Sequence, residues 1–84
     1  MSKFKIYGKE SCAPCRTVKM ILDKKGIAYD YIDIEEDAEA LDEMIGLYEM
    51  TTVPIVVSKD RVMYGYTPSI LMEMIKDYYE QQKL

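Results

Sequence analysis

The chain has 84 residues, of which 49% are hydrophobic, and a formal net charge of −4. Its length allows a single domain, spanning residues 1–84, and its acidic balance argues against nucleic acid, which needs a basic patch. With no secretory signal at the start and no apolar run long enough to cross a membrane, we expect a cytoplasmic protein without membrane partners.

The first part of the chain predicts a strand, a helix and a second strand. Residues 3–7 alternate between polar and apolar side chains, which is typical of a strand. Residues 13–25 place apolar side chains at helical spacing, and Gly26 is suited to end that helix. Residues 28–34 are rich in aromatic and β-branched types, which favours a strand. This order predicts a parallel βαβ unit with a right-handed crossover.

The middle of the chain predicts a short helix and a hairpin. An acidic run indicates a helix over residues 37–45 that ends at Gly46. Residues 54–57 and 61–64 read PIVV and RVMY on either side of a short turn that contains Lys59 and Asp60. This arrangement predicts an antiparallel hairpin.

A final helix completes the predicted fold. Thr67 is suited to cap it and Pro68 to be its first residue. Its apolar stripe consists of Ile70, Leu71, Met74, Ile75 and Tyr78. The order β-α-β-α-β-β-α predicts an α/β fold in which three helices flank one four-stranded mixed sheet.

Two cysteines, Cys12 and Cys15, lie where the first strand gives way to the first helix. A permanent disulfide is uncommon in the cytoplasm, and so short a loop would constrain the unfolded chain very little. A structural zinc site needs four ligands, and a chain with two cysteines and no histidine supplies two. The absence of histidine also excludes Cys-His nucleophilic catalysis. A reactive dithiol is therefore the favoured interpretation.

The predicted helix start distinguishes the two cysteines. Cys12 is placed at the cap, where a thiolate can accept the free N–H of Cys15 and gains from the helix dipole. Lys9 and Arg16 add positive charge nearby, so we expect Cys12 to be the attacking sulfur, with a lowered pKa. Cys15 lies one turn further along, within disulfide distance, and is expected to resolve a mixed disulfide on Cys12. Pro14 is tolerated in a first turn.

Three short motifs resemble the thioredoxin superfamily, and the chain length is similar to that of glutaredoxins. They are CAPC at residues 12–15, TVP at 52–54 and Gly65 after the last strand; the resemblance covers residues 3–79. It implies that Val53–Pro54 is a cis peptide beside Cys12. It also implies that the Val53 backbone pairs with an extended substrate, and that Lys9 meets a carboxylate of glutathione.

Two departures bear on the physiological reductant. Ala13 and Pro14 replace the Pro-Tyr pair common between glutaredoxin cysteines. Residues 65–69 lack the second glycine and the acidic pair that hold glutathione in that family, and instead resemble the hydrogen-donor redoxins of ribonucleotide reductase. Those redoxins are reduced by thioredoxin reductase, and Lys19 also fits that subgroup.

The sequence thus predicts a small thiol–disulfide oxidoreductase. Catalysis is assigned to Cys12 and Cys15, and substrate binding to Lys9, Tyr7, Ala13, Pro14, Thr52, Val53, Pro54, Gly65 and Tyr66. We expect a monomer without a bound cofactor or metal that reduces a protein disulfide. It is expected to act as a donor to ribonucleotide reductase or a similar enzyme, with electrons from thioredoxin reductase. The alternatives are a glutathione-dependent glutaredoxin and a metal or iron–sulfur carrier that uses the two thiolates.

Overall fold

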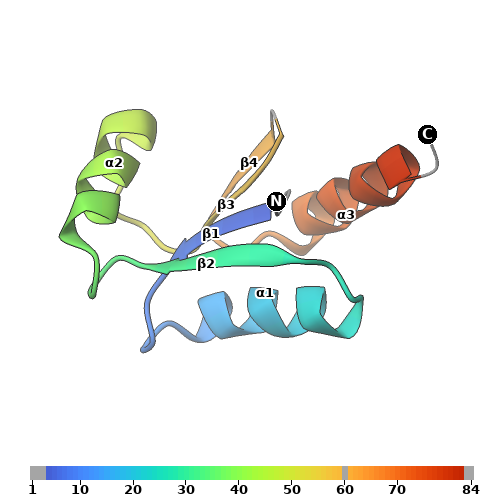
Figure 1. Cartoon of the computed structure of the whole chain (residues 1–84), viewed down its shortest axis with the longest axis horizontal. Coiled ribbons are helices and arrows are strands. Elements are labelled where there is room, and N and C mark those ends of the chain that lie inside the picture. The colour runs from blue at the N-terminus through green and yellow to red at the C-terminus, as the bar shows by residue number, and fades with distance from the viewer. Residues whose placement is uncertain (1–3, 60, 83–84) are drawn as a thin grey trace.

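The computed structural model describes residues 4–59 and 61–82 (Figure 1). Its elements follow the predicted order, which confirms the fold class. The strands are β1 (Phe4–Gly8), β2 (Tyr29–Asp33), β3 (Ile55–Ser58) and β4 (Arg61–Tyr64), and the helices are α1 (Ala13–Lys24), α2 (Ala38–Tyr48) and α3 (Pro68–Gln82). Lys3 and Asp60, which the sequence placed in the first strand and the hairpin turn, lie outside the described residues.

The four strands form one mixed sheet in the order β2-β1-β3-β4. β1 pairs with β2 in parallel, with Gly8 opposite Asp33, as the βαβ prediction requires. β3 is antiparallel to both β1 and β4. The parallel pair brings the carboxyl ends of β1 and β2 to the edge where α1 and α2 begin.

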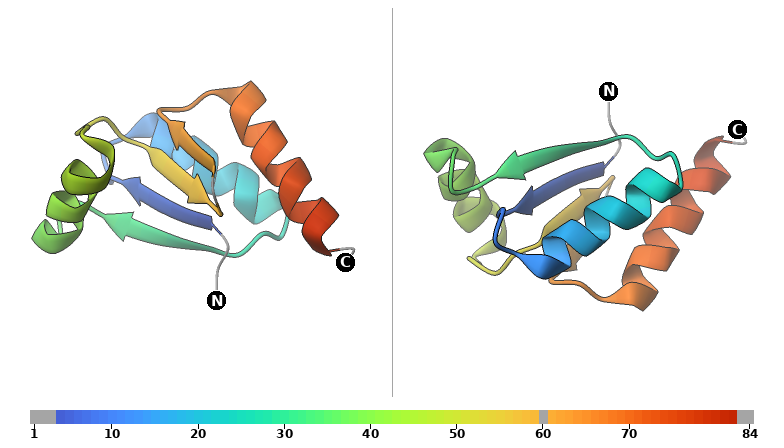
Figure 2. Two further views of the ribbon diagram at one scale, coloured as in Figure 1. Left: turned by 90° about the horizontal axis from the view of Figure 1, so that it is seen from above. Right: turned by 90° about the horizontal axis from the view of Figure 1, so that it is seen from below.

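Helices cover both faces of the sheet (Figure 2). Helices α1 and α3 pack on one face, over a buried cluster that includes Phe4, Ile6 and Leu22. Helix α2 covers the other face through a smaller cluster that includes Tyr7 and Met44. Strand alternation explains the division, because neighbouring residues of β1 point to opposite faces.

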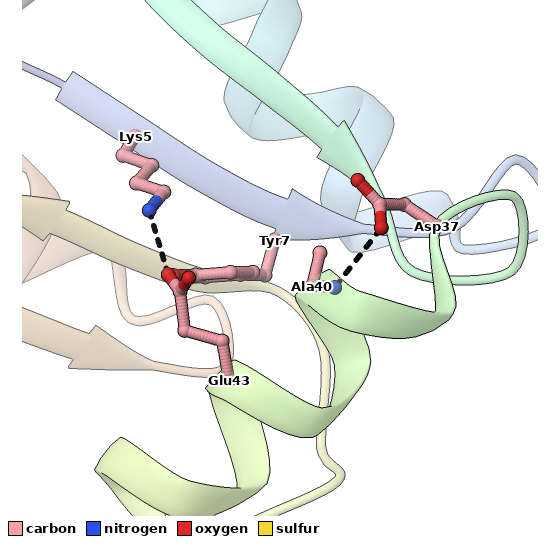
Figure 3. Close-up of polar contacts among 5 residues, drawn as sticks. All are labelled: Lys5, Tyr7, Asp37, Ala40 and Glu43. Carbon is pink, nitrogen blue, oxygen red and sulfur yellow. Dashed lines mark hydrogen bonds and ion pairs between the residues drawn. The ribbon is translucent and has the colours of Figure 1, made fainter.

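Local sequence chemistry accounts for three of the helix ends. The Asp37 carboxylate accepts the Ala40 N–H at 3.1 Å and caps α2 (Figure 3). Gly26 follows α1 with a φ of 68°, as expected of a helix-ending glycine. The carbonyl of Thr67 accepts the Leu71 N–H at 3.0 Å, which is consistent with a cap before Pro68.

The predicted end of α2 was wrong. Gly46 lies inside the helix, which runs to Tyr48, and Glu49 adopts the left-handed conformation after it, with a φ of 55°. Tyr48 packs against the α2 cluster and meets the Tyr7 ring edge-on, with ring centroids 6.1 Å apart. This tertiary packing holds the helix beyond the glycine.

Candidate functional site

The two cysteines form a disulfide at the start of α1. Their Cα atoms are 5.2 Å apart, within the range that a disulfide requires. Cys12 is the cap residue, with extended backbone, and its Sγ accepts the Cys15 N–H at 3.1 Å. The cap interaction that the sequence predicted is therefore present. Once the disulfide is reduced, the same N–H and the helix dipole favour the thiolate of Cys12.

The two sulfurs differ in their access to solvent. The Cys15 side chain is fully buried, whereas Cys12 is half-buried and Ala13 and Pro14 beside it are exposed. A partner disulfide can reach Cys12 from this exposed side. Cys15 is shielded within the first turn of the helix.

Positive charge lies close to the helix start. The Arg16 guanidinium donates a hydrogen bond from Nη1 to the carbonyl of Glu10 at 2.9 Å, so it folds back over the loop that precedes Cys12. Lys9 lies in the same loop and is half-buried. It also borders an open groove of about 490 Å³, whose other lining includes Ile34, Leu41 and Thr51.

The segment that leads into β3 contacts the segment that follows β4. The Val53–Pro54 peptide is cis, as the family resemblance implied. The carbonyl of Pro54 accepts the Gly65 N–H at 2.8 Å, which ties the start of β3 to the end of β4. Thr52 is exposed, and the Val53 side chain packs against the cluster beneath α2. Tyr66 is half-buried against the cluster beneath α1 and α3.

The prediction that Tyr7 lines a substrate groove was wrong. Its side chain is fully buried on the α2 face, and its hydroxyl donates a hydrogen bond to Glu43 at 2.6 Å (Figure 3). Tyr7 was expected near Cys12 because it ends the predicted strand. Alternation along β1 decides otherwise, since Gly8 rather than Tyr7 faces the cysteines.

Sequence reasoning placed Tyr31 in the second predicted strand and did not assign it to the site. The Tyr31 hydroxyl donates a hydrogen bond to the carbonyl of Lys9 at 3.2 Å, in the loop before Cys12. The Lys19 ammonium lies 4.2 Å from the centre of the Tyr31 ring. The available sequence signal was Gly8 at the end of β1. A glycine there leaves room for a side chain from a neighbouring strand, and the Tyr31 side chain takes that room.

Comparison with known proteins identifies the family. The sequence profile of the glutaredoxin family matches residues 4–63. The chain belongs to the glutaredoxin family. As a member, it is a thiol–disulfide oxidoreductase whose redox-active group is the Cys12–Cys15 disulfide. The family acts on protein disulfides and draws its electrons from a reductant.

Individual proteins and one solved structure are also similar to this chain. The "Gene 56 protein" of Mycobacterium phage D29 is 33% identical over 88% of this chain and 82% of its own length. The "Glutaredoxin-like protein NrdH" of Lactococcus lactis subsp. lactis is 30% identical over 82% of this chain and 94% of its own. The crystal structure of a glutaredoxin from Archaeoglobus fulgidus superposes with a TM-score of 0.79 at 26% identity, covering 90% of this chain and 88% of that one.

Two properties of the described residues bear on metal and membrane binding. Among residues 4–59 and 61–82, no group of three or more cysteine, aspartate or glutamate side chains is arranged to hold a metal ion. Over the same described ranges, every helix is too short or too polar to cross a membrane.

Proposed function

We propose that Cys12 attacks a protein disulfide and Cys15 resolves the product. The observation that carries this assignment is the contrast between Cys12, half-buried at the helix cap beside the exposed Ala13 and Pro14, and the fully buried Cys15. The Cys12 thiolate bonds to one substrate sulfur and expels the other as a thiolate. The Cys15 thiolate then bonds to Cys12 Sγ and expels the second substrate sulfur. Two electrons pass to the substrate, whose thiolates take up the protons released by the two thiols.

The proposed substrate site surrounds Cys12. Lys9, Ala13 and Pro14 belong to the loop and first turn that carry this sulfur. The second wall is proposed to come from Thr52, Val53 and Pro54 together with Gly65 and Tyr66, and the Pro54–Gly65 hydrogen bond supports their acting as one surface. An extended substrate backbone would pair with that of Val53.

We further propose that thioredoxin reductase supplies the electrons and that the substrate is ribonucleotide reductase or a similar enzyme. Residues 65–69 supply no carboxylate for the amino end of glutathione, and α3 begins within them, at Pro68. The likeness to the NrdH protein of Lactococcus lactis supports the same subgroup. In this role residues 1–84 would act as one monomeric domain in the cytoplasm.

Glutathione is the alternative reductant, and one observation favours it. Lys9 and Thr51 border the same open groove, so an ammonium group is available for a carboxylate ligand there. In that case the protein would be a glutathione-dependent glutaredoxin that binds the tripeptide without the acidic pair.

The two reductants are compared by NADPH oxidation with the oxidised protein. One assay contains thioredoxin reductase, and the other contains glutathione and glutathione reductase. Fast turnover with thioredoxin reductase alone supports the proposal. Fast turnover with glutathione and glutathione reductase alone would contradict it and support the glutathione-dependent alternative. A Lys9→Gln variant serves as control, because it should slow the glutathione assay if Lys9 binds a carboxylate. Turnover in neither assay would contradict both reductant assignments and favour the metal or iron–sulfur carrier.

A further inference from the structure

The Tyr31 hydroxyl and the buried Cys15 sulfur face the same small space. A Cβ atom added to Gly8 would lie 2.5 Å from Tyr31 Oη and 3.0 Å from Cys15 Sγ. The separation of these two atoms therefore cannot exceed the sum of those distances. Because Gly8 has no side chain, the Tyr31 hydroxyl can lie where a Cβ atom at this buried position would otherwise be. Tyr31 is thus a near neighbour of the sulfur that must resolve the mixed disulfide.

We propose that the Tyr31 hydroxyl is the hydrogen-bond donor that stabilises the Cys15 thiolate during the resolving step. This inference rests on the proposed resolving role of Cys15. It assigns a partner to a sulfur that is buried, in a chain that has no histidine. A buried thiolate without a donor would be costly, whereas one that accepts a hydrogen bond is stabilised.

The hydroxyl can change partners through a small local movement. In the oxidised structure it donates to the Lys9 carbonyl at 3.2 Å, which is long for an O–H donor. After reduction, rotation about the phenol C–O bond, with a small approach of the two side chains, would direct the hydrogen toward Cys15 Sγ. The Lys9 carbonyl keeps a partner meanwhile, because it also accepts the Cys12 N–H at 3.2 Å. Redirection therefore leaves no backbone group unsatisfied.

The surrounding charges suit a donor that stays protonated. Burial, followed by the charges of Asp33 and Glu10, raises the pKa of Tyr31, and Arg16 opposes them. Tyr31 is therefore a neutral phenol at pH 7, able to donate. On α1, Lys19 places its ammonium 4.2 Å from the ring centre, one turn beyond Cys15, and fixes the ring by a cation–π contact.

In the resolving step one sulfur–sulfur bond forms as another breaks, and solvent takes up and returns the proton. Cys15 first loses its proton to solvent, and its thiolate accepts the Tyr31 hydrogen bond. The thiolate then attacks Cys12 Sγ, the Cys12–Cys15 bond forms, and the bond from Cys12 to the substrate sulfur breaks. The departing thiolate takes a proton from solvent, and Tyr31 returns to the Lys9 carbonyl. Tyr31 itself is neither oxidised nor deprotonated.

A two-phase reaction with 5,5′-dithiobis(2-nitrobenzoate) separates the two steps. Attack by Cys12 releases one coloured thiolate, and resolution by Cys15 releases the second. In Tyr31→Phe we expect an unchanged first phase and a second phase about tenfold slower, since a hydrogen bond to a charged group is lost. The pH midpoint of the second phase should move to higher pH. Tyr29→Phe is the matched control, because its hydroxyl bonds Asp23 on the surface at 2.9 Å.

The outcomes separate this inference from the proposed function. A second phase in Tyr31→Phe with the normal rate and pH midpoint would overturn the inference and leave the role of Cys15 intact. A second phase that persists in Cys15→Ser would instead contradict the proposed function. If Tyr31→Phe does not fold, 3-fluorotyrosine at position 31 provides the test. Its stronger hydrogen-bond donor should lower the pH midpoint of the second phase, and an unchanged midpoint would overturn the inference.

Discussion

The Glu43 carboxylate on α2 accepts a hydrogen bond from the Tyr7 hydroxyl on β1, with 2.6 Å between the two oxygens (Figure 3). The same carboxylate oxygen receives the Lys5 ammonium at 2.9 Å. The Lys5 ammonium also lies 5.0 Å from the centre of the Tyr7 ring. These three side chains connect the helix to the sheet on the face opposite the cysteines. Their contribution to stability can be measured apart from catalysis.

Tyr7→Phe removes the hydroxyl and keeps the buried ring. We expect the free energy of unfolding to fall by about 1 kcal/mol, the usual net value of such a hydrogen bond. Urea denaturation of the oxidised protein measures this loss. Tyr29→Phe is the control, since its hydroxyl bonds Asp23 at an exposed site and should matter less. Equal losses in the two variants would mean that the part-buried contact with Glu43 contributes no more than the exposed contact of Tyr29.

Glu43 should make stability depend on pH in the acid range. The hydrogen bond from Tyr7, and after it the contact with Lys5, holds the pKa of Glu43 below its ordinary value. The stabilisation is therefore fully present above the unfolded pKa of about 4.3 and is lost as the pH falls through the lower, folded pKa. Urea titrations of the wild type and Glu43→Gln should differ at neutral pH and converge in acid. A constant difference across that range would contradict this pKa.

The sequence anticipated features that depend on neighbouring residues. The cap at Cys12, the turn at Gly26 and the order of strands and helices all follow from short patterns. The orientation of Tyr7 was not anticipated, although alternation along β1 determines it. Tyr31 was harder still to place. Its position beside Cys15 depends on the parallel register of β1 and β2, which joins residues more than twenty positions apart.

The end of α2 illustrates a different limit. A glycine in an acidic, exposed segment is a reasonable helix stop, yet the helix continues through Gly46 to Tyr48. The Tyr48 ring packs edge-on against Tyr7 and Tyr64, at centroid distances of 6.1 and 6.2 Å. Both contacts bridge segments distant in sequence. Local propensity favoured a helix end at Gly46, whereas tertiary packing extends the helix to Tyr48.

Two glycines should respond to alanine in opposite directions. At Gly8 the added Cβ would meet Tyr31 Oη at 2.5 Å, so we expect a loss of about 1–3 kcal/mol from overpacking. At Gly46, in a helix with open space around it, alanine should stabilise by about 0.5–1 kcal/mol. Urea denaturation of both variants tests the pair. A Gly8→Ala protein as stable as the wild type would show that Tyr31 can give way at no cost.

Cys15→Ser should interrupt the reaction after its first step. Cys12 can still attack a protein disulfide, but the hydroxyl of serine cannot resolve the mixed disulfide. We expect the substrate to remain attached to Cys12, and turnover without glutathione to cease. Non-reducing electrophoresis and intact-mass measurement detect the adduct, and added dithiothreitol should release it. Full turnover of a protein disulfide by this variant would rule out the two-step scheme.

Substitutions at Cys12 separate its chemical role from its role as helix cap. A serine hydroxyl can accept the Cys15 N–H as the sulfur does, whereas alanine cannot. Both variants should lose all disulfide reduction, because the attacking sulfur is gone. Only Cys12→Ala should also lose stability relative to the reduced wild type, by about 1 kcal/mol. Urea denaturation under reducing conditions makes the comparison, since the disulfide then contributes to none of the three proteins. Equal stability of the serine and alanine variants would show that the cap contact adds little, and that Cys12 acts through its chemistry alone.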